Sequence, residues 1–186
     1  MEINKKLRAA KYEYIALSIL SCILGIWVII KPEVSFGGLC IFGGIFLFLL
    51  GCVKIAGFLS KDLYQLAFQF DLAAGIIAVI LGFTFIFKKS FKVTTVFIIF
   101  GLIILVDSVL KVQTAIEAKS FGIPKWWLIL CFAIVTSILG LNLMLQSFVS
   151  YPRLLIQLGV AMIGEGILNS TTVLTAVNII QKKRIK

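Results

Sequence analysis

The sequence predicts an all-α, polytopic membrane protein with six transmembrane helices, arranged as three tandem helical hairpins in parallel orientation. Composition is the first reason: 61% of the 186 residues are hydrophobic and 14% are charged. A soluble domain is about half apolar and about a quarter charged. The mean hydropathy is +1.12. The second reason is a series of six apolar runs that repeat in pairs, since a bilayer is crossed by about 18 or more apolar residues.

The repeat is visible in one tripeptide. Ile23-Leu24-Gly25 recurs as Ile80-Leu81-Gly82 and as Ile138-Leu139-Gly140, with the three glycines 57 and 58 residues apart. Similarity at a fixed period indicates repeated structural units. We therefore divide a single transmembrane domain, residues 1–186, into repeat one (about 13–57), repeat two (about 66–114), repeat three (about 126–172) and a basic cytoplasmic tail (181–186).

Each repeat contains two spans joined by a turn. Pro32 and Pro152 fit the turns of repeats one and three, because proline is common just beyond a helix end. In repeat two, the basic turn at 88–92 stands where proline is expected. Trp126-Trp127 opens the fifth span, as in an interfacial aromatic belt. The predicted spans are Tyr14 to Ile30, Phe36 to Phe58, Leu66 to Phe87, Val93 to Val112, Trp126 to about Leu145, and Leu154 to about Thr172.

Basic residues orient the chain. Six spans place both termini on one side, and that side holds 13 of the 18 lysines and arginines when Lys54 and Lys111 are counted with it. Positive charge is enriched on the cytoplasmic side, so we predict a multi-pass protein of the cytoplasmic membrane with both termini cytoplasmic. The net charge of +10 then favours anionic lipid headgroups at the cytoplasmic basic segments. Nucleic acid is not an expected partner, since no basic groove with interleaved aromatics is present, and a homo-oligomer stays open.

Small residues mark the predicted helix contacts. Lipid is as apolar as leucine, so membrane helices associate through close packing at small side chains. Each span carries two small residues seven positions apart, a spacing that stays on one face of supercoiled helices. The twelve positions are Ser18 and Gly25, Gly44 and Gly51, Gly75 and Gly82, Gly101 and Ser108, Ala133 and Gly140, and Gly159 and Gly166.

Two acids, Asp107 and Glu165, lie inside spans at equivalent repeat positions. An acid inside a span is costly and is a functional hypothesis by default. Asp107 lies five residues before the predicted span end at Val112, about 7.5 Å at 1.5 Å per residue. It is therefore expected near the cytoplasmic boundary, paired with Lys111 at i+4. Glu165 lacks a charged residue at that spacing, because Asn169 is neutral.

Two interpretations of these acids remain open. In the first, both acids satisfy local partners near the inner interface. In the second, Asp107, Glu165, Lys111 and Lys54 form a cytoplasm-facing polar cluster that binds protons or lines a pathway. Asp71, near the start of the third span, is expected at the interface.

The remaining chemistry argues against catalysis. Histidine is absent, which removes the commonest general base and the commonest metal ligand. The four cysteines lie inside apolar runs without a CxxC pair, so they are expected to behave as small apolar side chains. Gly37-Gly38 and Gly43-Gly44 match neither phosphate-binding glycine pattern. We expect no enzyme, no metal and no cofactor.

The hairpin pattern resembles the HdeD family of small bacterial and archaeal membrane proteins, over about Tyr14 to Thr172. The matching features are the Ile-Leu-Gly tripeptides, the turn prolines, Trp126-Trp127, and the acids followed by small residues, Asp107-Ser108 and Glu165-Gly166. The missing proline of repeat two departs from the pattern. The resemblance implies a link to acid resistance and assigns no residue a role.

Three functions follow as expectations. The first is an acid-stress or membrane-integrity factor without catalytic activity. The second is a small transporter or proton-conducting channel that uses the intramembrane acids. The third is a membrane scaffold that binds another protein through its connectors or its basic tail.

Overall fold

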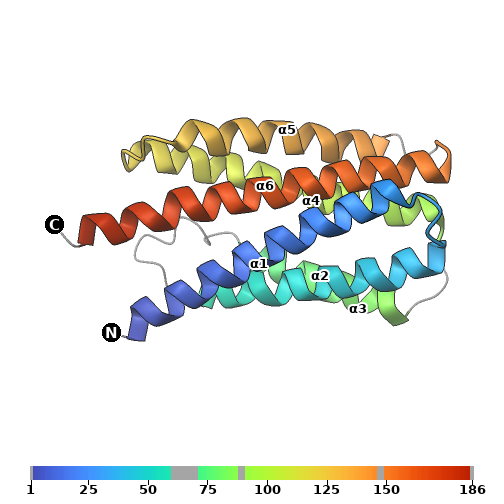
Figure 1. The fold of residues 1–186 in the computed structure, drawn as a ribbon, viewed down its shortest axis with the longest axis horizontal. Coiled ribbons are helices and arrows are strands. Elements are labelled where there is room, and N and C mark those ends of the chain that lie inside the picture. The colour runs from blue at the N-terminus through green and yellow to red at the C-terminus, as the bar shows by residue number, and fades with distance from the viewer. Residues whose placement is uncertain (1, 60–70, 88–90, 146–148, 185–186) are drawn as a thin grey trace.

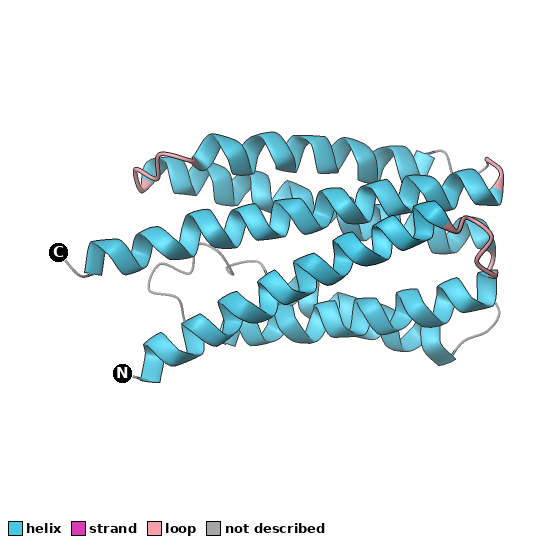
Figure 2. Cartoon of the chain, viewed as in Figure 1, coloured by secondary structure: helices cyan, strands magenta, loops and turns pink. Residues whose placement is uncertain are grey.

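In the computed structural model, the described residues are 2–59, 71–87, 91–145 and 149–184, with side chains described within 9–59, 71–87, 91–145 and 149–175. These residues form six α-helices (Figure 2), which confirms the all-helical class. The helices are α1 (Glu2–Ile30), α2 (Phe36–Leu59), α3 (Asp71–Phe87), α4 (Val93–Ser120), α5 (Trp126–Leu145) and α6 (Tyr151–Arg184). The predicted start of the third span at Leu66, the lysines of the turn at 88 and 89, and the tail end at 185–186 lie outside the described residues.

The outside of the bundle is apolar. Ile23, Ile80 and Ile138, which occupy equivalent repeat positions, are exposed by 57, 58 and 60%. Five helices are long and apolar enough to cross a membrane, and α3 contributes a further apolar helix of 17 described residues. Large apolar side chains on the outside are stable in contact with lipid and unfavourable in water. The protein is therefore an integral, multi-pass membrane protein.

The helices pack mainly across the repeat boundaries. The most extensive contacts join α2 with α3, α4 with α5, and α1 with α6. Each of these pairs joins the second helix of one repeat to the first helix of another, and the α1–α6 pair joins the last helix of the chain to the first (Figure 1). Both termini lie at one end of the bundle. Contacts within a repeat are fewer, and those between α3 and α4 are the fewest of the three.

The fourth helix does not end at Val112, as predicted, but continues to Ser120. It ends where Gly122 adopts a φ of +72°, a conformation that favours glycine. The Ile123 N–H donates to the Ala118 carbonyl oxygen at 3.0 Å. This bond and the glycine form a Schellman-type ending, which satisfies carbonyl groups of the last turn.

Candidate functional site

Four charged side chains from three helices form a continuous ion network, which we define as Lys54 on α2, Asp71 on α3, and Asp107 and Lys111 on α4. Asp107 is its centre, since one carboxylate oxygen accepts a bond from Lys54 Nζ and the other from Lys111 Nζ at 2.5 Å. Lys54 Nζ also donates to Asp71 Oδ1 at 2.9 Å. All four residues are buried, with exposed fractions of 2 to 7%. Charge-assisted hydrogen bonds therefore join α2, α3 and α4 inside the bundle.

Asp71, predicted near the interface at the start of the third span, is buried within the bundle. Its residue is 7% exposed, and its second carboxylate oxygen accepts a hydrogen bond from the hydroxyl of Tyr14 on α1. Sequence reasoning missed both residues as members of the site. A signal was available, because Tyr14 precedes Asp71 by 57 residues, the same offset that relates Gly25 to Gly82.

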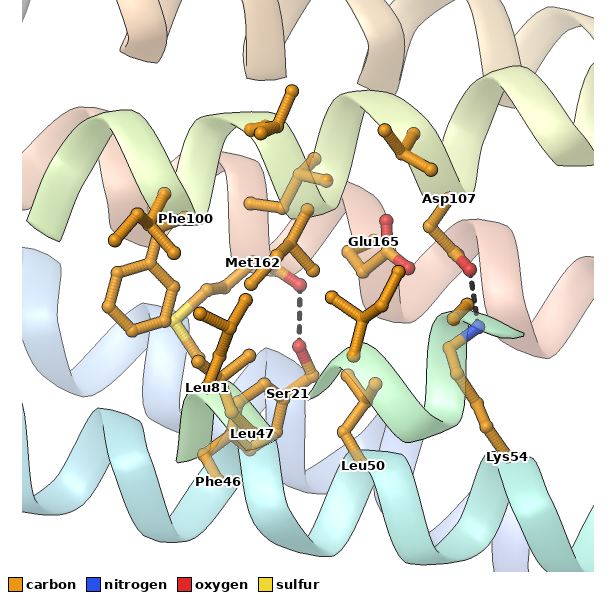
Figure 3. Close-up of a pocket in the computed structure, with 17 residues that line it drawn as sticks. Ser21, Phe46, Leu47, Leu50, Lys54, Leu81, Phe100, Asp107, Met162 and Glu165 are labelled. Atoms are coloured by element: carbon orange, nitrogen blue, oxygen red, sulfur yellow. Dashed lines mark hydrogen bonds and ion pairs between the residues drawn. The ribbon is translucent and has the colours of Figure 1, made fainter. Parts of the chain in front are cut away.

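Glu165 on α6 extends the buried polar region beyond the ion network. It is 5% exposed, and its Oε1 accepts a hydrogen bond from Asn169 Nδ2 at 2.9 Å. Its Oε2 receives no hydrogen bond from the described residues. Figure 3 shows Glu165 and Asp107 on the same side of one cavity, with Lys54 across from Asp107. The structure thus brings together the four residues predicted as a polar cluster, and it supplies Glu165 with an amide partner rather than a cation.

The polar residues occupy equivalent positions in the three repeats. Tyr14 and Asp71 are one such pair. Asp107 and Glu165 are another, with Leu50 in repeat one. Lys54, Lys111 and Asn169 form a third set. Because α1 and α6 close the bundle, these sets meet in its interior. The site is therefore built from positions that the sequence repeat relates, with different charges in each copy.

Among the residues that the structure describes, the charges of this region do not balance. Asp71, Asp107 and Glu165 supply three carboxyl groups, whereas Lys54 and Lys111 supply two ammonium groups. An uncompensated charge in a low-dielectric interior is strongly unfavourable. A proton or an incoming cation would remove the excess. Glu165 Oε2 is where either would find a free acceptor.

The depth predicted for Asp107 was measured from the predicted span end at Val112, and α4 continues past that residue to Ser120. Asp107 lies near the middle of α4, about 20 Å of helix from Ser120 at 1.5 Å per residue. Water does not reach it directly, since only 4% of the residue is exposed. Local pairing with Lys111 is present, but within the bundle interior.

The predicted small residues of α2 and α3 lie against one another. A Cβ added to Gly44 would lie 2.9 Å from the Gly82 carbonyl oxygen, and one added to Gly51 would lie 2.6 Å from that of Gly75. Real Cβ atoms show essentially no contacts below 3.0 Å. The two helix backbones therefore approach as closely as glycine allows at both positions.

The other two helix pairs follow the same scheme. A Cβ on Gly101 would lie 2.8 Å from the Gly140 oxygen of α5, and one on Gly25 would lie 2.6 Å from the Gly159 oxygen of α6. A Cβ on Gly166 would meet the Ser18 carbonyl oxygen at 2.6 Å. Ser108 of α4 differs from these glycines, because its hydroxyl accepts a hydrogen bond from the Ser137 hydroxyl of α5 at 3.0 Å.

The described residues contain no group of three His, Cys, Asp or Glu side chains that could hold a metal ion. All four cysteines are free thiols. The polar atoms of the site are instead arranged as ion pairs between the lysines and the carboxylates.

The fold and the site together define a class, which is a multi-pass helical membrane protein with an internal repeat and a buried ionic site. The family model described as a short repeat of unknown function (DUF308) matches residues 16–87 and again residues 73–145. The chain belongs to this DUF308 short-repeat family. No curated protein and no solved structure matches the chain.

Proposed function

We propose that this protein is an HdeD-type acid-stress factor of the cytoplasmic membrane, and that it works without catalysis by binding a proton in the ion network and Glu165. The resemblance of its tandem hairpins to the HdeD family supports the acid-stress context. The observation that carries the proton-binding site is that buried Glu165 has one carboxyl oxygen without a donor among the described residues. The described part of this region also has one carboxyl group more than its ammonium groups.

A proton pathway is the second candidate function. Glu165 and Asp107 line one cavity, and Lys54 joins Asp107 to Asp71, so a proton on Glu165 would lie beside further charged groups of the bundle interior. Intramembrane carboxyl groups that face cavities mark proton relays in transporters and pumps. This candidate requires net proton movement, whereas the first requires only proton binding.

We expect Glu165→Gln to abolish the proton-linked function, because the amide keeps the shape of the side chain and loses its titratable group. Cells that express the wild-type chain should survive an acid shock better than cells that express this variant. Glu33→Gln, at an exposed position in the turn between α1 and α2, is the matched control and should behave as wild type. Equal survival of Glu165→Gln and wild type, at equal amounts of folded protein, would contradict the proposal.

Liposomes that contain a pH-sensitive dye separate the two candidates with the same variants. A potassium diffusion potential drives protons inward through any pathway. Flux in wild type and in Glu33→Gln, but background flux in Glu165→Gln, supports conduction. Background flux in all three proteins would eliminate the proton pathway. The stress-factor role would then remain the supported function if survival still depends on Glu165.

The proposed orientation places both termini in the cytoplasm. Lys54 and Lys111 are buried members of the ion network, so they do not count as loop charges, contrary to the prediction. Without them, 11 lysines and arginines remain on the side of the termini and five on the other, which still favours a cytoplasmic location. Basic segments on that side would contact anionic headgroups.

Reporter fusions test this orientation. We expect green fluorescent protein to fluoresce at either end of the full chain, because it folds in the cytoplasm, and alkaline phosphatase at the same ends to be inactive, because it needs the oxidising side. Active phosphatase at the C-terminus would reverse the orientation.

A further inference from the structure

One neighbouring pair of helices leaves an open seam. Helices α3 and α4 follow each other in the chain, yet they share far fewer contacts than α2 with α3 or α4 with α5. Each of these two helices is held by its other neighbour through small residues, at Gly75 and Gly82 of α3 and at Gly101 of α4. The sparse contact between α3 and α4 therefore follows from the packing of the bundle, because each helix is fixed against its other neighbour.

A cavity of about 250 Å³ occupies this seam. Ala74 and Ile77 of α3 line it on one side, and Leu102 and Val106 of α4 line it on the other. Ile77, Leu102 and Val106 are also exposed on the outside of the bundle, by 53, 47 and 43%. The mouth of the cavity thus opens on the surface that faces the acyl chains, so an apolar guest can enter sideways from the bilayer.

Part of the cavity lining is polar. Lys54, Asp107 and Glu165 line it (Figure 3). Lys54 is engaged by two carboxylates, and both oxygens of Asp107 accept bonds from ammonium groups. Glu165 Oε2 alone among these three side chains has an acceptor that is unused by the described residues, and its residue is 95% buried. A largely apolar pocket with one convergent polar group is the usual form of a small-molecule site.

We propose that this cavity binds a lipophilic primary amine, which enters from the bilayer between α3 and α4 and places its ammonium group against Glu165 Oε2. The apolar walls suit an alkyl body. The ammonium group supplies the donor that Glu165 lacks and the positive charge that the three carboxyl groups and two lysines leave uncompensated. A neutral alcohol supplies a donor but no charge, and a carboxylate adds to the excess negative charge.

Octylamine is a suitable probe. We expect saturable, one-to-one binding of tritiated octylamine to the full chain in nanodiscs, measured by scintillation proximity with empty nanodiscs subtracted. Unlabelled octanol should compete about tenfold more weakly or worse, since hydrogen bonds to a charged group are the stronger ones, and octanoate should not compete. Equal competition by all three compounds would overturn the proposal, because it indicates partition into an apolar space.

Two substitutions locate the site. Glu165→Gln should weaken octylamine binding about tenfold or more by removing the charge. Ala74→Phe should abolish binding by filling the cavity, whereas Ala73→Phe, on the exposed neighbouring position of α3, should bind as wild type. Size-exclusion profiles confirm that each variant is folded, and Ala74→Phe tests the site even if Glu165→Gln does not fold. Unchanged binding in folded Ala74→Phe would place the amine elsewhere. Octylamine binding is measured on the full chain in nanodiscs and acid survival is measured in cells, so either result can fail without the other.

Discussion

Lys54→Met is expected to lower the free energy of unfolding by about 3–5 kcal/mol, the usual cost of removing one partner from a buried ionic group. Lys54 is shared by Asp71 and Asp107, and it is 2% exposed. Methionine fills a similar volume but leaves both carboxylates short of their common cation. The excess of carboxyl groups over ammonium groups then rises from one to two.

Reversible unfolding in mixed detergent micelles measures this loss. Lys125→Met, at an exposed position just before α5, is the matched control and should change stability by no more than about 0.5 kcal/mol. The double variant Lys54→Met/Asp71→Asn restores the wild-type charge excess, so it should be more stable than Lys54→Met alone. A Lys54→Met protein as stable as the Lys125→Met protein would show that the ion network does not hold α2, α3 and α4 together.

Much of this site followed from the repeat. Sequence spacing placed Asp107 and Glu165 at equivalent positions and paired Asp107 with Lys111, and the structure has that pair. The same spacing also related Tyr14 to Asp71, but a tyrosine and an aspartate at span ends are ordinary interfacial residues. Their meeting required knowledge that the Tyr14 side chain of α1 reaches the start of α3 inside the bundle. An internal repeat shows which positions are equivalent, but it does not show which helices contact one another.

The end of the fourth helix was the second feature that the sequence did not predict correctly. Residues 113–125 contain enough polar side chains to indicate a connector, and the structure shows helix as far as Ser120. The polar residues of this stretch share the helix with small ones, and Ala115 and Ala118 are fully buried. A hydropathy pattern reports the average of both faces, so it ended the helix too early. Asp107 therefore lies near the middle of α4 rather than near its end, and it is buried.

The close approach of the helices is the second feature whose removal should have a large effect. We expect Gly82→Leu to destabilise the protein by about 3 kcal/mol, the upper end of the usual cost of overpacking. Even a Cβ at Gly82 would lie 2.6 Å from the Phe48 nitrogen and 2.7 Å from the Gly44 oxygen. Both are backbone atoms, which cannot rotate away as a side chain would, so α3 must move off α2.

Gly37→Leu is the control, because a Cβ at Gly37 meets no atom within 4 Å. Leucine is the better helix former, so this variant should be as stable as wild type or slightly more so in the same unfolding assay. Gly25→Leu and Gly140→Leu should lose stability as Gly82→Leu does, since an added Cβ at each would lie within 3.0 Å of a backbone atom of α6 or α4. Three similar losses would show that the bundle is held by one interface used three times. A loss at only one of the three sites would mean that the repeats have diverged in packing as they have in charge.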